Sequence, residues 1–334
     1  MSEFLDAILE RFGDAMIVSD THEVSAVSTG SMSLDVSTGI GGIPRGRFTE
    51  IYGPEGSGKT TLALTAAKNV VECGGKVLYI DAEVMLSYPA IDVMLGYKFK
   101  ADDFVLLQPE TAEDAFMSIE EALESGGFDL IVVDTVAALE PRAEKEKDFD
   151  KATMAEISRM LPKFFKRNAA KVRDNNVAIL LLNQVRDKVG SYTQGYNSPG
   201  GHALKHHTSM IIALTKGDTM KIGDKSIGIM SKFVIKKNKL SAPFRSYFIP
   251  IIFGRGIDLY SDAVDFCSML GVIKKKGSYY KFEDVVLGQG KLAAGDYLKE
   301  HKETLDKIQE KVYTLLNNTT VIDVDGEAEG EENE

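Results

Sequence analysis

The sequence predicts an α/β protein in which a mostly parallel sheet is covered by helices on both faces, followed by a small second α/β domain. Short aliphatic runs alternate along the chain with longer stretches of helical periodicity. Parallel strands are buried on both faces, so they are apolar along their whole length. The strands expected from this pattern are residues 48–52, 77–80, 104–107, 130–133, 177–182 and 210–214.

Helices are expected to connect these strands. Apolar residues recur at helical spacing in 59–72, 111–125 and 152–174. Upstream, residues 3–12 predict a short amphipathic helix, and the Ser-, Thr- and Gly-rich stretch 28–46 predicts turns around another short helix.

The pattern changes after the last parallel strand. Residues 231–236 and 247–253 predict neighbouring strands joined near Pro243, and Pro250 places the second strand at a sheet edge because proline donates no ladder hydrogen bond. A helix near 259–270, a basic and aromatic segment and a helix at 291–316 then predict the compact C-terminal domain.

Composition limits the class of protein. The chain has 334 residues, with 39 Lys and Arg against 50 Asp and Glu, for a net charge of −11. Seven acids lie in residues 323–334, so the remainder carries only −4. This balance excludes a globally basic nucleic-acid binder, although local basic loops are compatible with it. The acidic tail is expected to be disordered.

We therefore expect four regions: residues 1–23 as an N-terminal helix and linker, 24–255 as the main core, 256–320 as the C-terminal domain and 321–334 as the tail. Two cysteines provide neither a disulfide framework nor a zinc site. The first residues lack the basic and apolar pattern of a signal peptide, and no aliphatic run is long enough for a membrane span. These features predict a cytoplasmic protein without membrane contact.

The strongest local motif is GPEGSGKT at residues 53–60, which follows a strand and opens a helix. Glycines allow the backbone to approach phosphate oxygens, and the helix N-terminus adds further N–H donors. The motif predicts ATP and Mg²⁺ as cofactors, with Lys59 at the β- and γ-phosphates and Thr60 at Mg²⁺. The expected nucleotide-binding set is Gly53, Pro54, Glu55, Gly56, Ser57, Gly58, Lys59, Thr60 and Thr61.

Two further acidic sites end aliphatic strands. LIVVD ends in Asp134, whose carboxylate is expected to hold a Mg²⁺-bound water beside the loop. YIDAE carries Asp81 and Glu83, of which we assign Glu83 as the base that activates water, while Asp81 could brace a loop. The alternative for this pair is two loop-capping acids.

Several longer motifs resemble bacterial RecA-type recombinases, including phage-borne ones. They are STGSMSLD, IYGPEGSGKTTL, YIDAE, VVDTVAALEPRAE, LLNQVRDKVG, GGHALK, KKNKLSAPF and GQGK, in the family's order. The resemblance implies a RecA-like phosphate-loop ATPase core and a homo-oligomeric helical filament on single-stranded DNA. That filament would pair with double-stranded DNA and exchange strands, with loader or repressor proteins as candidate partners. In it, residues 1–23 would contact the adjacent subunit and the acidic tail would restrain duplex entry.

The resemblance also implies residue roles. Gln184 would sense the γ-phosphate as a third catalytic residue with Glu83 and Lys59, and Tyr260 would pack near the adenine. Lys237 and Lys239 would reach the ATP of the neighbouring subunit. The residues that would contact DNA are Met154, Arg159, Arg186, Lys188, Tyr192, Gly200 and Gly201. The segment containing Lys274–Lys276, Tyr279, Tyr280 and Lys281 resembles a duplex-capture surface, with an ordinary exposed hairpin as the alternative.

The match is incomplete in places, and other functions fit parts of it. The N-terminal helix is shorter than the family's, and the adenine-stacking tyrosine is not clearly placed, with Tyr88 as the nearest candidate. A DNA-binding filament or regulatory relative with weak exchange is one alternative. A hexameric motor with the same core is another, although the paired lysines of KKNKLSAPF favour a filament.

Overall fold

The computed structural model describes residues 24–145, 155–184 and 201–317, and every structural statement below concerns these residues. The expected helix at 3–12 and the acidic tail lie outside them, as do residues 146–154 and 185–200. Within the described ranges, none of the helices combines the length and apolarity needed to span a membrane.

A nine-stranded sheet forms the centre of the molecule, in the order β11-β10-β9-β8-β3-β7-β6-β4-β5. The six strands from β8 to β5 pair in parallel, while β9, β10 and β11 are antiparallel to their neighbours. This arrangement confirms the predicted mostly parallel sheet. The strands are β3 (Arg47–Gly53), β4 (Val77–Asp81), β5 (Phe104–Leu107), β6 (Leu130–Asp134), β7 (Ala178–Gln184), β8 (Met210–Ile222), β9 (Lys225–Asn238), β10 (Ser246–Ile252) and β11 (Gly256–Ile257).

Successive side chains of each central strand enter two different cores. In β6, Leu130 and Val132 join the apolar cluster on one face of the sheet, whereas Ile131 and Val133 join the cluster on the other. Strand side chains alternate between the two faces, so a strand that is covered on both sides has no polar face. This burial explains the uninterrupted aliphatic runs in the sequence.

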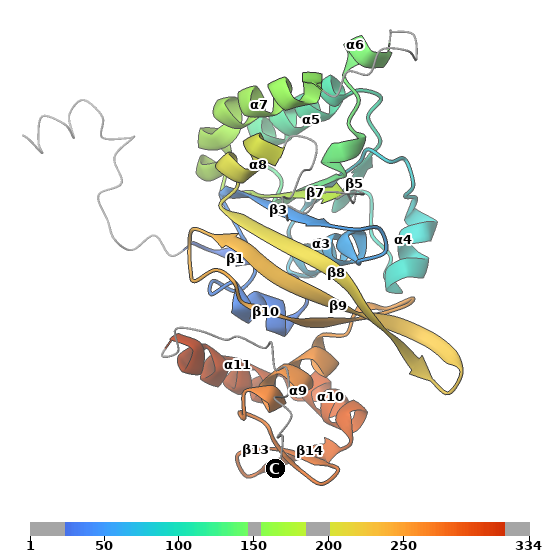
Figure 1. Cartoon of the computed structure of the whole chain (residues 1–334), viewed down its shortest axis with the longest axis vertical. Helices are drawn as coiled ribbons and strands as arrows, with labels where there is room; N and C mark the ends of the chain where they lie inside the picture. The colour runs from blue at the N-terminus through green and yellow to red at the C-terminus, as the bar shows by residue number, and fades with distance from the viewer. Residues whose placement is uncertain (1–23, 146–154, 185–200, 318–334) are drawn as a thin grey trace, which may run out of the picture.

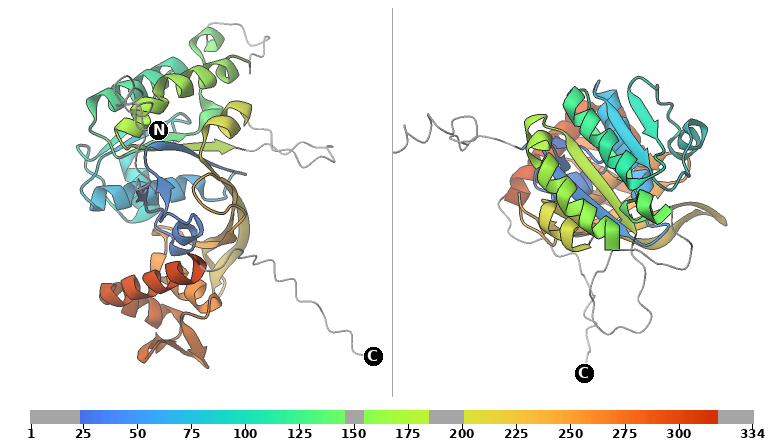
Figure 2. Two further views of the ribbon diagram at one scale, coloured as in Figure 1. Left: turned by 90° about the vertical axis from the view of Figure 1, so that its left-hand side faces the viewer. Right: turned by 90° about the horizontal axis from the view of Figure 1, so that it is seen from above.

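Helices cover both faces, as the view from above in Figure 2 shows. Residues of α3 and α4 pack into the first cluster, and residues of α5, α7 and α8 pack into the second. The helices of this region are α3 (Lys59–Glu72), α4 (Tyr88–Leu95), α5 (Ala112–Ser125), α6 (Arg142–Lys145), α7 (Ala155–Asp174), α8 (Gly201–His207) and the 3₁₀ turn η2 (Val136–Ala138).

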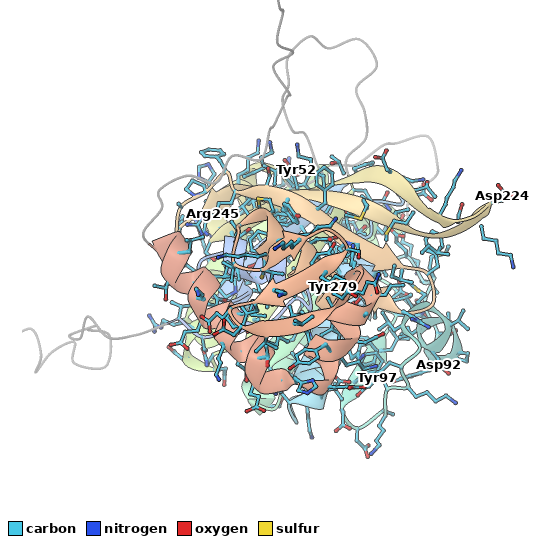
Figure 3. All side chains as sticks on the ribbon, turned by 90° about the horizontal axis from the view of Figure 1, so that it is seen from below. Tyr52, Asp92, Tyr97, Asp224, Arg245 and Tyr279 are labelled. Carbon is cyan, nitrogen blue, oxygen red and sulfur yellow. The ribbon has the colours of Figure 1, made fainter. Side chains whose placement is uncertain are left out.

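The antiparallel side of the sheet differs from the prediction. The strands expected at 210–214 and 231–236 extend into a long hairpin, β8 and β9, which projects from the body and turns near Asp224 (Figures 1 and 3). Strand β10 lies next to the edge rather than at it, because the two-residue β11 pairs with Ile251 and Ile252. Pro250 itself lies beyond that pairing, so its missing N–H removes no bond to β11.

A short N-terminal layer connects the two domains. It contains β1 (Ala26–Val27), α2 (Met32–Ser37) and β2 (Ile43–Pro44). Leu34 of α2 packs into the first core cluster, whereas Met32 and Val36 pack into a third cluster that belongs to the C-terminal domain. The helix α2 is therefore shared between the core and the C-terminal domain.

The C-terminal domain lies at one end of the molecule, below the large sheet in Figure 1. It contains α9 (Leu259–Met269), a three-stranded sheet of β12 (Lys274–Lys276), β13 (Tyr279–Phe282) and β14 (Val285–Gln289), and helices α10 (Lys291–Glu300) and α11 (Lys302–Asn317). The single helix expected at 291–316 is wrong, because the backbone of His301 leaves the helical conformation at φ −119° and ψ 70°. Leu298 and Ile308 are both buried in the third cluster, so the break lets two helices pack on one small core.

Candidate nucleotide site

The phosphate loop follows β3 and leads directly into α3. Helix α3 begins at Lys59, and its N-cap Gly58 adopts a left-handed backbone with φ 91°. A Cβ on Gly53 would lie 2.1 Å from the carbonyl oxygen of Leu214, and one on Gly58 would lie 2.2 Å from Cδ1 of Ile251. Both positions therefore require glycine, Gly53 because a Cβ would collide with the backbone of β8, and Gly58 because its left-handed backbone strains any other residue. The loop thus lies at the carboxyl end of β3 and the N-terminus of a helix, where anions are stabilised.

The Lys59 ammonium lies inside the loop. Its Nζ donates hydrogen bonds to the carbonyl oxygens of Gly53 and Pro54, each at 2.9 Å. Burial lowers the pKa of Lys59, and the nearby carboxylates of Asp134, Glu83 and Glu55 oppose that shift. The same acids keep a cation favourable at this position, beside the place where the loop presents its N–H groups.

Asp134, at the end of β6, contacts both the phosphate loop and the neighbouring strand β4. Its Oδ2 accepts hydrogen bonds from the hydroxyl groups of Thr60 at 2.8 Å and Tyr79 at 2.7 Å. Burial raises the pKa of Asp134, and these two hydrogen bonds oppose the rise. A hydroxyl and a carboxylate in contact are hard oxygen ligands of the kind that Mg²⁺ prefers.

Glu83 and Gln184 come together from different strands. The Gln184 Nε2 donates to Glu83 Oε1 at 2.6 Å, and the Thr135 hydroxyl donates to the same oxygen at 3.2 Å. Gln184 also pairs with Gly53, the first residue of the phosphate loop, in the register of β7 and β3. Gln184 is therefore next to the start of the phosphate loop in the sheet, and its side-chain amide reaches the exposed carboxylate of Glu83.

Asp81, the other acid of YIDAE, has a different environment. Its Oδ2 accepts hydrogen bonds from the backbone N–H of Leu86 at 2.8 Å and from Gln108 Nε2 at 2.9 Å. Asp81 is buried and holds the turn that follows β4, whereas Glu83 is exposed. Of the two acids, only Glu83 is thus oriented toward solvent next to the loop.

The remaining assigned residues lie elsewhere. Lys237 of β9 lies opposite Ile211, near the start of β8, and the Lys239 N–H bonds to the carbonyl of Ser209. Because β8 is parallel to β3, both lysines lie near the amino ends of the parallel strands, whereas the phosphate loop is at their carboxyl ends. Tyr260 is in the first turn of α9 and packs against the third cluster. Arg159 is exposed on α7, and Gly201 opens α8. Met154, Arg186, Lys188, Tyr192 and Gly200 lie outside the described residues.

Three tyrosines that the sequence singled out have clear places in the structure. Tyr280 is only 7% exposed and packs in the third cluster, so it is not part of an exposed duplex surface, while Tyr279 is 45% exposed. Tyr88 donates its hydroxyl to the carbonyl of Phe104 at 2.8 Å and so ties α4 to the edge strand β5.

Sequence reasoning missed Tyr79 and Thr135 as parts of the site. Thr135 immediately follows Asp134, and Tyr79 is a fully buried residue within the strand that carries Asp81. The available signal was the hydroxyl of Tyr79, which stands in the otherwise aliphatic run of β4. A second aliphatic strand, β6, ends in the acid Asp134. The partner of the Tyr79 hydroxyl could be identified only from the pairing of β4 with β6, which places Asp81 opposite Asp134.

Comparison with known proteins identifies the family. The model of the RecA N-terminal domain matches residues 1–258, and that of the RecA C-terminal domain matches residues 261–317. The chain is 39% identical to a Protein RecA of Thermus thermophilus, over 98% of this chain and 96% of the relative. It is 41% identical to Protein RecA of Thermus aquaticus, over 92% of this chain and 90% of the relative.

A more distant relative and a solved structure agree. Protein RecA of Bacillus subtilis strain 168 is 36% identical over 95% of this chain and 92% of the relative. The crystal structure of the RadB recombinase superposes with a TM-score of 0.51 at 25% identity, covering 69% of this chain and 98% of that structure. The chain therefore belongs to the RecA family of DNA-dependent ATPases and recombinases.

Proposed function

We propose that the loop at residues 53–61 holds the phosphates of ATP, that Thr60 and Asp134 hold Mg²⁺, and that Glu83 activates water under the control of Gln184. As a RecA-family member, the chain is a recombinase with DNA-dependent ATP hydrolysis and strand exchange. The observation that carries the residue assignment is the hydrogen bond of Gln184 to Glu83, from a position opposite the first residue of the phosphate loop in the register of β7 and β3.

The residues fit the proposed cofactors. Gly56 and Gly58 carry no side chain just before the N-terminus of α3, where backbone N–H groups favour an anion. Lys59 supplies a buried cation, and Thr60 with Asp134 supplies the oxygen pair. When bound, Mg²⁺ neutralises developing phosphate charge.

Within this site each side chain has a limited task. The carboxylate of Glu83 accepts the proton of the attacking water and is kept oriented by Thr135 and Gln184. The Gln184 amide can hydrogen-bond either to this carboxylate or to a phosphate oxygen, so a terminal phosphate would draw it away from Glu83. That exchange would free the base only when the correct nucleotide is present, and it would move the start of the following segment.

The proposal extends to the neighbouring subunit and to DNA. Lys237 and Lys239 lie at the opposite end of the strands from their own phosphate loop, which supports a role at the ATP of an adjacent subunit. We place DNA at Met154, Arg159, Arg186, Lys188, Tyr192, Gly200 and Gly201, with Tyr260 near the adenine. We also place the protein in the cytoplasm, with domain boundaries near residues 23, 255 and 320 and with loader or repressor proteins as further partners.

Measuring ATP turnover with and without single-stranded DNA tests the proposal. We expect turnover to rise on DNA, and electron microscopy with a slowly hydrolysed ATP analogue to show helical filaments. The Lys59→Ala variant controls for contaminating activity. Turnover that is equal with and without DNA, together with closed six-membered rings under every condition, would instead favour a hexameric motor.

A further inference from the structure

Glu50 is a fully buried carboxylate that the proposed function does not use. It lies in β3, three residues before the phosphate loop, and its side chain is 0% exposed. A buried carboxylate is costly unless hydrogen bonds or a nearby cation compensate for the lost solvent. The partners of Glu50 are therefore informative about its role, and they extend in two directions across the sheet.

The first partner leads to the hydrolytic site. Asn183 is also fully buried, and its Nδ2 donates to Glu50 Oε1 at 3.1 Å. The Oδ1 of the same amide accepts the backbone N–H of Gln184 at 3.1 Å. Because Glu50 is an acceptor when ionised, it fixes which end of the Asn183 amide faces β3 and thereby directs Oδ1 toward Gln184.

The second partner leads away from the phosphate loop. Glu50 is opposite Ile211 of β8, and Ile211 is opposite Lys237 of β9. Phe48, on the same face of β3 as Glu50, packs in the cluster that contains Leu204 of α8, and the Lys237 ammonium bonds to the end of α8, so Glu50 and Lys237 share that face. The charge of Glu50 supports the Lys237 cation, whose pKa is lowered chiefly by burial and further by the nearby Lys239.

Lys237 in turn holds the end of α8. Its Nζ donates to the carbonyl oxygen of Thr208 at 2.6 Å and also to that of Lys205. Carbonyl groups at a helix C-terminus lack partners within the helix, and a cation there satisfies them. The described contacts thus run from Gln184 through Asn183 to Glu50, and from Glu50 through the charge of Lys237 to the end of α8.

We propose that Glu50 is a positioning residue that links the nucleotide-sensing Gln184 to Lys237. The inference rests on the proposed roles of these two residues. When the Gln184 side chain changes partner, its backbone N–H shifts against Oδ1 of Asn183. The Asn183 amide then moves relative to the carboxylate of Glu50. The hold of Glu50 on the Lys237 ammonium changes with it, so the lysine either caps α8 or is released toward an adjacent subunit.

Two variants separate the links, and a third is a matched control. Glu50→Gln keeps an acceptor for Asn183 but removes the charge that supports Lys237. Asn183→Ala removes the bond to Gln184 but keeps the charge. Thr49→Val changes the neighbouring buried position of the same strand, where Oγ1 has no hydrogen-bond partner among the described residues.

Hydrogen–deuterium exchange of the nucleotide-free full chain tests the links without relying on activity. We expect Glu50→Gln to increase exchange at the end of α8 and Asn183→Ala to increase it at Gln184, while Thr49→Val changes neither. Wild-type exchange in both segments for both variants overturns the proposal. An equal rise throughout the chain also overturns it, since that result means a general loss of stability.

Kinetics then test the consequence for the reaction. For Glu50→Gln we expect ATP affinity within about twofold of wild type, DNA-stimulated kcat reduced about tenfold, as expected from losing one charge-assisted contact, and weaker cooperativity in ATP. Unchanged kcat and cooperativity in Glu50→Gln contradict the link. If the wild type itself shows no DNA-stimulated turnover, the proposed function fails, whereas the exchange results still decide whether Glu50 connects the two segments.

Discussion

Gln184 Nε2 and Glu83 Oε1 are 2.6 Å apart, which joins the end of β7 to the turn after β4. The two residues are 101 positions apart in the chain. Their contact places a neutral amide, which can change partners, on the carboxylate proposed to activate water. Hydrolysis would then depend on whether the amide bonds to Glu83 or to a phosphate oxygen. Replacing Gln184 or Glu83 should reveal that dependence.

The first prediction concerns the base. Glu83→Gln should retain ATP binding and lower kcat about 10²–10⁴-fold, because the amide cannot accept the proton of water. Glu140→Gln, at another exposed acid, serves as the control. Steady-state turnover and binding of a fluorescent ATP analogue would be measured side by side. A wild-type rate in Glu83→Gln would remove Glu83 from the reaction.

Lys59→Ala should abolish ATP hydrolysis. It removes the buried cation and both hydrogen bonds to the carbonyl groups of Gly53 and Pro54. Lys68→Ala removes a lysine from the same helix, where the ammonium lies 3.7 Å from Glu72, and should keep activity. Isothermal calorimetry with ATP would follow binding, and unchanged affinity together with unchanged turnover would contradict the role of Lys59.

Gly53→Ala should destabilise the fold and weaken nucleotide binding. The added methyl group would meet the carbonyl oxygen of Leu214 at 2.1 Å, and overpacking of this kind typically costs about 1–3 kcal/mol. Gly127→Ala is a matched control, since Gly127 does not have a left-handed backbone and a Cβ there would meet only Oγ of Ser125, at an ordinary contact distance of 3.8 Å. Urea denaturation of both variants measures the difference, and equal stability would argue against the close contact of β3 with β8.

Arg159 offers a test of DNA binding on a described residue. Its side chain is exposed on α7, and each phosphate contact with single-stranded DNA contributes a slope of about −0.7 to log K against log salt. Arg159→Ala should reduce that slope by about one contact, whereas Arg167→Ala, on the same helix, should leave it unchanged. Fluorescence anisotropy over a salt series gives the slope. Identical slopes for the two variants would place DNA elsewhere.

The pH dependence of stability should report on Asp262. This residue of α9 is fully buried, and its Oδ2 accepts hydrogen bonds from the Ser31 hydroxyl and the Ser33 N–H, both at 2.9 Å. Burial raises its pKa from 3.8 to about 6, although these hydrogen bonds oppose the rise. The folded state therefore holds more protons than the unfolded state in this window, so this contribution to stability is lost as pH rises through it.

Asp262→Asn should remove that dependence. The pKa difference corresponds to roughly 3 kcal/mol in the free energy of unfolding, so the wild type should lose about that much relative to the variant between pH 4 and pH 7. Asp35, with a pKa raised to about 7 by burial, changes stability in the same direction in both proteins. Asp296→Asn, at an exposed acid of α10, is the control. Parallel stability curves for wild type and Asp262→Asn would contradict the assignment.

Local signals explain what could be predicted. The alternation of strands and helices follows from side-chain periodicity, and the phosphate loop follows from glycines that must stand at fixed spacing between a strand and a helix. Even within the elements, however, some boundaries depended on distant packing. The break at His301 and the burial of Tyr280 follow from closing a small core, and no short stretch of sequence shows that requirement.

The class of fold, the nucleotide loop and the family resemblance could all be read from the amino-acid sequence, because each depends on residues close together in the chain. The folded arrangement was needed to show which of Asp81 and Glu83 faces solvent, that Asp262 binds the start of α2, and that Lys237 caps α8. These contacts join residues up to 231 positions apart. Their existence depends on strand order and on which face each side chain enters, and both are set by burying two apolar clusters at once.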